Sequence, residues 1–336
     1  MLDSSTLNKI DVNGMYKVYD RWPEIAKKSY DENHKPLDIG FVNHIIFAGM
    51  GGSGALSDIF YSILSKSSVH VNVIKGYILP KPTNANSLVV VTSVSGNTDE
   101  ALTVLDSAKK LNCKIIAFSS GGKMEEYCVK NNIEYRKIQQ IHSPRASLIV
   151  FLYSMLKVLG QLFSIKAQDI EESILELENT AKKINSKNLT DTNPSLSLAR
   201  WISDVPVIYY PWGLQAAAIR FKNCLQENAK SHVIAEDVIE ACHNGIVSWE
   251  GQSKAKPILL SGWDDNIKTI ERWEILKEYF DSNKIDYKQI MSVHGSILSK
   301  LVNLIYLLDY STIYLAVLSE IDPSPVKSID FVKKRL

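Results

Sequence analysis

Cysteine is scarce in this sequence, and no two cysteines stand close together. The four residues form no CxxC pair and match no disulfide framework of a small secreted domain; they are Cys113, Cys128, Cys224 and Cys242. We therefore expect reduced thiols that fill small spaces inside a cytoplasmic protein.

The sequence also lacks an excess of charge of either sign. The formal net charge is +1, which gives no electrostatic argument for a nucleic-acid partner or for an acidic membrane surface. The first twenty residues are polar and mixed in charge, which does not fit a signal peptide. The most apolar stretch, residues 301–318, contains Asn303 and Asp309 and predicts a buried helix rather than a membrane span.

Metal-binding motifs are missing as well. The sequence contains neither H-E-x-x-H nor a Cys/His cluster with the spacing of zinc ligands. We expect neither a metal ion nor another cofactor.

Apolar and helical patterns alternate along the chain. Between residues 43 and 137, short apolar runs alternate with segments of helical spacing, which is typical of an α/β fold with a mostly parallel sheet. A second α/β pattern begins at residue 206 and repeats the first. We predict an N-terminal domain over residues 1–150, a helical connection over 151–190 and a C-terminal domain over 191–336.

Two turns between a strand and a helix are rich in glycine and hydroxyl side chains. Gly49-Met50-Gly51-Gly52-Ser53-Gly54 follows the apolar run 44–48, and Ser93-Val94-Ser95-Gly96-Asn97-Thr98 follows the run 87–91. In a parallel sheet both turns can lie at one edge, where their N–H groups and hydroxyls surround a single phosphate. The sequence therefore predicts that the protein holds its ligand by a phosphate monoester.

Two other interpretations of the glycine turn compete with this one. The turn has the G-x-G-x-x-G spacing of dinucleotide sites, but the next strand ends in Lys75-Gly76, where such a site needs an acid for the ribose. A turn that only lets helix and strand pack closely would not require three hydroxyl groups in the second turn.

The second half of the chain repeats the plan without a second phosphate turn. Its first predicted strand, residues 206–210, leads into Pro211-Trp212-Gly213, which carries no hydroxyl group. We infer one phosphate site per chain, in the N-terminal half.

At these residues the chain resembles the SIS (sugar isomerase) domain proteins. Gly51-Gly52-Ser53-Gly54 and Ser95-Gly96-Asn97-Thr98 correspond to that family's phosphosugar-binding signatures. The resemblance extends over nearly the whole chain to one branch, the archaeal-type bifunctional phosphoglucose/phosphomannose isomerases. Four further stretches carry it: Ser143-Pro144-Arg145-Ala146, Gln226-Glu227-Asn228-Ala229-Lys230, His243-Asn244-Gly245-Ile246-Val247-Ser248-Trp249, and Ser299-Lys300-Leu301 with the tail Asp322-Pro323-Ser324-Pro325-Val326.

The resemblance implies a fold, a ligand and a set of site residues. The fold is α/β, with two SIS domains in a pseudo-repeat, each a flavodoxin-like, doubly wound parallel sheet. The ligand is a hexose 6-phosphate, bound at Gly51, Gly52, Ser53, Ser93, Ser95 and Thr98. The family also implies a proton-transferring carboxylate at Glu227, a ring-opening histidine at His243, and basic residues near the sugar at Arg145 and Lys300. Its histidine comes from the partner subunit, which implies a homodimer.

Glu227 suits this role on chemical grounds. Aldose–ketose isomerisation moves a proton between C1 and C2 of an open-chain sugar through a cis-enediol, and one carboxylate can serve both carbons. Glu227 stands near the end of its predicted helix, where the helix dipole does not stabilise an acid. The alternative is an ordinary solvated acid on a helix surface.

The closed sugar ring must open before isomerisation, and a histidine can donate the required proton at neutral pH. His243 is the candidate, while His232 and His294 remain competitors. Arg145 can stabilise the negative charge of the enediolate. Its alternative role is an ion pair at the start of a helix.

One position departs from the pattern of the bifunctional enzymes. They have a threonine a few residues before the lysine, and its small size leaves room for the C2 epimer; Ser292 or Val293 stands there in this chain. Both side chains are small, so we expect mannose 6-phosphate to be accepted, and the relative rates stay open.

Three functions are compatible with these features. The leading one is reversible conversion of glucose 6-phosphate and fructose 6-phosphate, with mannose 6-phosphate as a second aldose. A phosphosugar sensor is the second, although the sequence offers no basic recognition helix for DNA. The third is an isomerase of another phosphosugar. An ammonia-dependent version would need an N-terminal cysteine nucleophile, and no cysteine precedes Cys113.

Overall fold

The structure of the chain, a computed structural model, describes residues 2–251 and 254–335. The strands are β1 (His44–Ala48), β2 (His70–Ile74), β3 (Leu88–Ser93), β4 (Lys114–Ser119), β5 (Glu134–Lys137), β6 (Pro206–Tyr210), β7 (Ile234–Asp237), β8 (Lys256–Ser261) and β9 (Lys288–Met291). The helices are α1 (Ser4–Ile10), α2 (Met15–Asp20), α3 (Trp22–Asp31), α4 (Gly52–Leu64), α5 (Asp99–Lys110), α6 (Gly122–Lys130), α7 (Leu148–Leu159), α8 (Ala167–Ile184), α9 (Pro194–Trp201), α10 (Gln215–Asn228), α11 (Val238–Ala241), the 3-10 helix η1 (Gly245–Glu250), α12 (Ile267–Ser282), α13 (Ile297–Leu318) and α14 (Lys327–Lys333).

The chain forms two compact units that are interleaved along the sequence. Residues 21–175 and 296–299 make up the first unit, and the remaining described residues make up the second. The domain boundaries expected at residues 150 and 190 stay a prediction.

The first unit is built on a five-stranded parallel sheet with the order β2-β1-β3-β4-β5. This is the strand order of flavodoxin-like folds, as the family resemblance implied. The two central strands β1 and β3 are buried along their whole length, which explains their nearly unbroken apolar runs. Their register pairs Ala48 with Val91, so the two strands end side by side.

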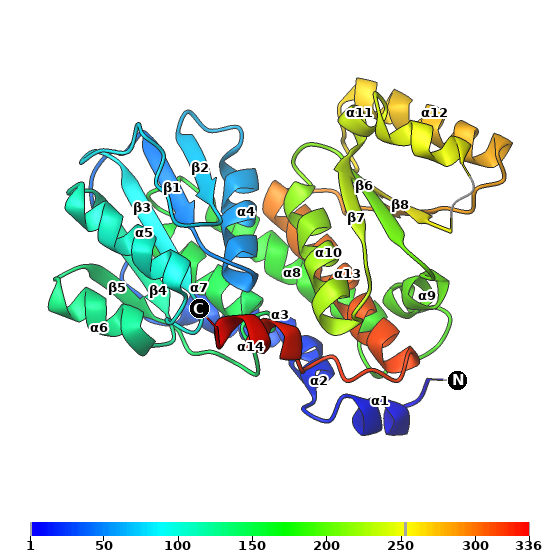
Figure 1. The fold of residues 1–336 in the computed structure, drawn as a ribbon, viewed down its shortest axis with the longest axis horizontal. Helices are drawn as coiled ribbons and strands as arrows, with labels where there is room; N and C mark the ends of the chain where they lie inside the picture. Colours follow the sequence, from blue (N-terminus) through cyan, green and yellow to red (C-terminus); the bar gives the residue numbers. More distant parts are fainter. Residues whose placement is uncertain (1, 252–253, 336) are drawn as a thin grey trace. The chain divides into compact units, whose positions relative to one another are not determined.

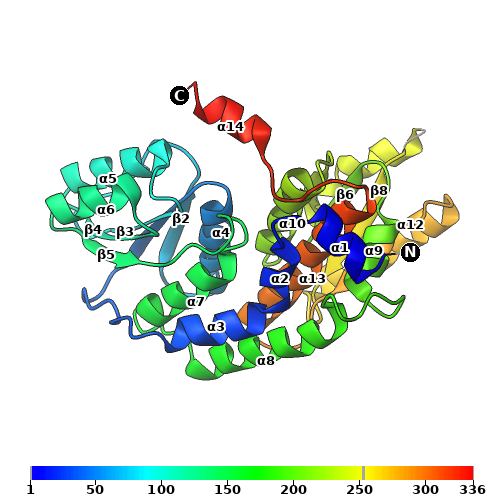
Figure 2. The same cartoon turned by 90° about the horizontal axis from the view of Figure 1, so that it is seen from below.

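Helices cover both faces of this sheet. Ile46, Val89 and Val91 pack with apolar side chains of α5 and α6 on one face. On the other face Phe47 stacks on Phe60 of α4, with 5.2 Å between ring centroids. Figures 1 and 2 show α5 and α6 on one side of the strands and α7 on the other. The sheet is therefore doubly wound.

The second unit repeats this plan with a four-stranded parallel sheet of the order β7-β6-β8-β9. The order matches that of the first four strands of the first unit, which confirms the predicted pseudo-repeat. Helix α12 and the segment from α11 through η1 cover one face, where Trp249, Trp273 and Phe280 form the core with strand residues. Helix α10 packs against β6 and β7 (Figure 1).

A buried ion pair joins helices α10 and α13 in the second unit. Nη2 of Arg220 lies 2.8 Å from Oδ2 of Asp309, and the two side chains are 2% and 0% exposed. The hydroxyl of Tyr19, at the end of α2, donates to the same carboxylate oxygen at 3.1 Å. Burial raises the pKa of the neighbouring Cys224 thiol well above its usual value. Three segments that are distant in sequence thus share one polar cluster.

Helix α13 is long and apolar enough to cross a membrane by length and composition, but 89% of its most apolar window is buried inside the protein. The predicted buried helix is confirmed. Its polar residues have partners in the second unit: the side-chain amide of Asn303, for example, donates to Thr180 at 2.8 Å.

Removing one member of the Arg220–Asp309 pair should destabilise the second unit strongly. Arg220→Met leaves Asp309 buried without its cation, and such a loss costs about 3–5 kcal/mol of unfolding free energy. The double variant Arg220→Met/Asp309→Leu should lose less than either single variant. Urea unfolding followed by tryptophan fluorescence reports mainly on the second unit, since Trp22 alone of the six tryptophans lies in the first. A loss below about 1 kcal/mol in both single variants would contradict this account.

Candidate functional site

The glycine turn (residues 49–52) and the serine loop (residues 93–98) lie at the same edge of the first sheet. They follow β1 and β3, which are parallel neighbours. The backbone N–H of Val94 donates to Oγ of Ser53 at 3.1 Å, so a direct hydrogen bond joins the serine loop to the start of α4. The two segments predicted to hold a phosphate are thus adjacent.

Hydroxyl groups also fix the shape of the serine loop. The hydroxyls of Ser93 and Thr98 are 2.9 Å apart, and the N–H of Gly96 donates to Oγ of Ser93 at 3.1 Å. Oγ of Ser95 accepts from the N–H of Asn97 at 3.3 Å. Ser93 is 1% exposed, so its hydroxyl supports the loop from inside, whereas Ser95 and Thr98 are partly exposed.

The helices that follow these two segments begin without a capping side chain. Gly51 precedes α4 with φ 54° and ψ −121°, a conformation that favours glycine, and it offers no side chain to cap the helix. Thr98 precedes α5, but its hydroxyl is directed to Ser93 and makes no capping bond. First-turn N–H groups of a helix without a cap are suited to bind an anion. Both helix starts therefore offer N–H groups to a phosphate, although the first turn of α5 also contains Asp99 and Glu100.

Arg145 lies next to the glycine turn. A Cβ placed on Gly52 would come within 3.2 Å of the Pro144 carbonyl oxygen and 3.4 Å of the Arg145 Cα. Arg145 is 4% exposed. The first unit thus gathers seven of the predicted site residues: Gly51, Gly52, Ser53, Ser93, Ser95, Thr98 and Arg145.

A third turn at this edge was missed in the sequence. It follows β4 as Ser119-Ser120-Gly121-Gly122 and leads into α6. A Cβ on Gly96 would lie only 1.7 Å from the carbonyl oxygen of Gly121, so this turn packs directly against the serine loop. The signal was present, because a buried strand followed by serines and glycines is the pattern of the other two turns.

Glu227 lies in the second unit, in the last turn of α10, and is partly exposed. The ammonium group of Lys230 donates to the Glu227 carbonyl oxygen at 2.5 Å and to the Pro325 carbonyl oxygen at 2.9 Å. The C-terminal tail is thereby bound beside the end of α10, directly before α14 with its lysines Lys327 and Lys333. The sequence analysis named Glu227 as a candidate site residue, but it did not predict that Lys230 would bind the C-terminal tail to the end of α10.

His243 and Glu227 stand at opposite edges of the second sheet. His243 is exposed and follows α11, just beyond the carboxyl end of β7. Helix α10 starts at that same edge and ends with Glu227 at the amino edge, because a helix between parallel strands runs antiparallel to them. Its 14 residues span about 21 Å. Within one chain the second unit does not bring these two residues together.

Lys300 is 8% exposed and forms an ion pair with Asp264, which follows β8. It lies at the start of α13, whereas the end of α10 contacts α13 near Thr312, the partner of Asn228 at 2.8 Å. About 18 Å of helix separates the two positions on α13. The structure therefore places Lys300 away from Glu227, and its proposed contact with the sugar stays a prediction.

The other candidates of the C-terminal half lie at the surface or are used in loops. His232 and His294 are exposed, and the His294 ring meets Trp263 edge-on at 6.3 Å between centroids. Ser292 is buried, and its hydroxyl accepts from the Trp263 N–H at 3.1 Å and donates to the Val293 carbonyl. Its hydroxyl therefore serves the loop, and its bearing on aldose specificity stays a prediction.

Comparison with known proteins decides the family. A profile of the bacterial phospho-glucose isomerase C-terminal SIS domain matches residues 191–336. A bifunctional phosphoglucose/phosphomannose isomerase of Caldicellulosiruptor bescii is 31% identical over 96% of this chain and 98% of its own length. The chain belongs to the bifunctional phosphoglucose/phosphomannose isomerase family.

One further relative and one solved structure are also similar to this chain. A protein of Sulfolobus acidocaldarius named D-glucosamine-6-phosphate 4-epimerase is 25% identical over 71% of this chain and 74% of its own length. The crystal structure of a hypothetical protein of Thermus thermophilus matches with a TM-score of 0.75 at 13% identity. It covers 98% of this chain and 92% of the other, and it supports the fold alone.

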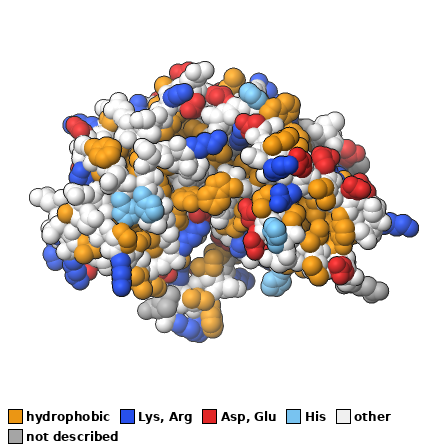
Figure 3. Space-filling view, turned by 90° about the horizontal axis from the view of Figure 1, so that it is seen from above, with side chains coloured by type: hydrophobic (Ala, Val, Ile, Leu, Met, Phe, Trp, Pro, Cys, Tyr) orange, Lys and Arg blue, Asp and Glu red, His pale blue; other side chains and the backbone are white. Residues whose placement is uncertain are grey.

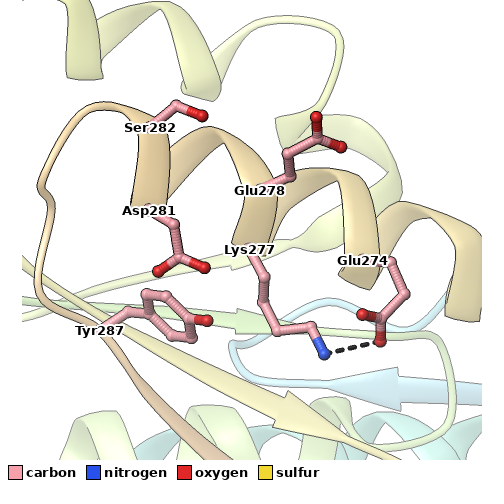
Figure 4. A pocket seen from close by; sticks show the side chains of 6 residues that line it. All are labelled: Glu274, Lys277, Glu278, Asp281, Ser282 and Tyr287. Atoms are coloured by element: carbon pink, nitrogen blue, oxygen red, sulfur yellow. Dashed lines mark hydrogen bonds and ion pairs between the residues drawn. The ribbon is translucent and has the colours of Figure 1, made fainter.

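One open cavity of about 450 Å³ lies elsewhere, on α12. Figure 4 shows Glu274, Glu278 and Asp281 around it, with Lys277 paired to Glu274 at 2.6 Å. Its acidic lining would repel a phosphate, and it contains none of the site residues that the family resemblance implies.

Acidic and basic side chains are both spread over the face of the isomerase-family chain shown in Figure 3, interrupted by hydrophobic ones. This mixture fits the net charge of +1. Figure 3 shows no broad basic area of described residues on this face.

The close packing of the serine loop on the third turn gives a prediction. Gly96→Ala combines a φ of +70° with the contact to Gly121, so it should lower the unfolding free energy by about 3 kcal/mol or more. Gly40→Ala is the matched control, since Gly40 has φ +67° but nothing within 4 Å of an added Cβ. The control should lose about 1–2 kcal/mol in urea unfolding followed by circular dichroism. Equal losses in the two variants would mean that the serine loop moves away from Gly121 with little loss of stability.

Proposed function

We propose that this protein interconverts glucose 6-phosphate and fructose 6-phosphate, and that mannose 6-phosphate is its second aldose. The observation that carries the proposal is the arrangement at the edge of the first sheet. Two helices without side-chain caps and a hydroxyl-rich loop meet there, tied by the Ser53–Val94 hydrogen bond. In a chain of the bifunctional phosphoglucose/phosphomannose isomerase family, this arrangement fits the phosphate of a hexose 6-phosphate.

In the proposed mechanism Glu227 is the proton carrier. It takes the proton from C2 of the open-chain aldose, and the electron pair forms the C1–C2 double bond while O1 becomes negative. O1 then gains a proton and O2 releases one, and Glu227 returns its proton to C1 to give the ketose. In this proposal Arg145, whose backbone lies next to the glycine turn, stabilises the negative enediolate.

The ring-opening proton comes from His243 of the partner subunit in this proposal. The support is the separation of Glu227 and His243 by the length of α10, together with the exposed position of His243. A symmetric homodimer would give each site one Glu227 and the partner subunit's His243.

We also infer a cytoplasmic location. All four cysteines are free, and burial raises the pKa of each thiol. Protonated free thiols fit a reducing compartment.

A second candidate is chemistry on an amino sugar phosphate at the same site. The similarity to the Sulfolobus protein favours it, because the name of that protein gives a hexosamine 6-phosphate as its substrate. The phosphate contacts would be the same, so only the products can separate the two functions.

An assay of EDTA-treated protein with fructose 6-phosphate tests the proposal. Both glucose 6-phosphate and mannose 6-phosphate should appear, because the proton can return to either face of C2. Glu227→Gln should lower kcat by about 100-fold or more while phosphosugar binding stays nearly intact, because the amide cannot carry the proton. Turnover retained by this variant would exclude Glu227 as the base. No product from the wild type would favour the amino sugar or a sensor.

A mixed dimer tests the sharing of the site. Glu227→Gln and His243→Ala chains carrying different tags are co-expressed, and dimers with one chain of each kind are purified. Each parent should be inactive or nearly so. The mixed dimer holds one complete site, formed by Glu227 of one chain and His243 of the other, so about half of the wild-type kcat per dimer is expected. An inactive mixed dimer would show that both residues act from the same chain.

A further inference from the structure

The three turns at the edge of the first sheet differ in how their helices begin. Helices α4 and α5 start without a capping side chain. At the start of α6, by contrast, the Lys123 N–H donates to Oδ1 of Asn97 at 3.1 Å, and the Met124 N–H donates to the Gly96 carbonyl at 2.9 Å. Two N–H groups in the first turn of α6 are therefore already bound to the serine loop.

Asn97 is the side chain that makes this connection. Its Oδ1 accepts from Lys123, and its Nδ2 donates to the Ser95 carbonyl at 3.1 Å. Gly122 packs closely against this connection, since a Cβ there would lie 2.7 Å from Oδ1 of Asn97 and 2.8 Å from the Ser95 carbonyl oxygen. Asn97 thus joins the backbone of Ser95 to the start of α6, although its own side chain is exposed.

We propose that Asn97 is a positioning residue for the phosphate: by tying Ser95 to α6, it holds the Ser95 hydroxyl in the orientation that binds the anion. This inference rests on the proposed function of the loop. Asn97 acts through Ser95 and has no part in proton transfer, so its removal weakens phosphate binding and leaves the chemical step alone.

The residue type agrees with this role. The connection needs one acceptor for the Lys123 N–H and one donor for the Ser95 carbonyl, and an asparagine amide supplies both without charge. An aspartate would keep the acceptor, lose the donor and place a negative charge beside the phosphate. A serine or alanine would not reach both partners.

The test is Asn97→Ala, with Asn84→Ala as the matched control. Asn84 makes bonds of the same kinds, since its Nδ2 donates to the Pro82 carbonyl at 2.9 Å and its Oδ1 accepts the Asn86 N–H at 2.9 Å, but both of its partners lie two residues away and join no second segment. It precedes β3, at the opposite edge of the same sheet. Both variants lose two side-chain hydrogen bonds and no charge. A difference between them therefore reports on where the bonds are lost and not on a general loss of stability.

For Asn97→Ala, the inhibition constant of inorganic phosphate and the KM of fructose 6-phosphate should each rise roughly tenfold, with kcat within about twofold of the wild type. The rise should persist at about 0.5 M KCl relative to the wild type at the same salt, because a lost orientation is not screened. Asn84→Ala should leave all three constants unchanged, and both variants should show a similar small fall in Tm.

Gly122→Ala provides a second approach, because its added methyl group pushes directly on the Asn97 side chain. It should raise the phosphate inhibition constant in the same way. Unchanged phosphate inhibition in Asn97→Ala, or an equal change in Asn84→Ala, would overturn the inference while wild-type turnover leaves the proposed function intact. A wild-type protein that binds neither inorganic phosphate nor fructose 6-phosphate would overturn both.

Discussion

The parallel pairing of β1 with β3 is the constraint on which the candidate site depends. It ends two buried strands side by side and sends α4 and α5 away from the same edge. A polar group between two strand ends would otherwise destabilise a core, and here the Ser53 hydroxyl is satisfied by the Val94 N–H. The first unit thus offers helix N–H groups and hydroxyls, rather than a cluster of lysines, to the phosphate that we propose.

The second unit has the same strand order but lacks a hydroxyl-rich turn after its first strand. Its turn after β6 contains Trp212, which is 65% exposed, and no hydroxyl group. The candidate residues of this unit are instead side chains at a helix end and in a loop after a strand, namely Glu227 and His243. The buried pair of Arg220 and Asp309 fixes α10 against α13, and so fixes the helix that carries Glu227. In the function proposed above, one copy of the plan would hold the phosphate, and the other would position the acid–base groups.

The sequence predicted much of this because strong local signals agree with the fold. Buried apolar runs followed by glycine and serine marked β1 and β3 and the turns after them. The turn after β4 was not predicted to belong to the site. It does so by packing against Gly96, and only the strand order brings the two together. The separation of Glu227 and His243 follows from the antiparallel run of α10 between the parallel strands β6 and β7. The two motifs that carry these residues lie close together in sequence and do not show this separation by themselves. The ion pair of Lys300 with Asp264 was likewise invisible, since it joins a helix to a loop that precedes it by 36 residues.

The interleaving of the two units has a consequence for synthesis of the chain. Tyr19 belongs to the second unit, but its partner Asp309 comes 290 residues later. At the usual translation rate of roughly 5–20 residues per second, the N-terminal helices wait about 15–60 s before the helix they pack on exists. The first sheet, with β1 to β5 complete by residue 137, can form during this interval. Helices α1 and α2 are therefore among the last parts of the second unit to reach their native contacts, although they precede the rest of that unit in the chain.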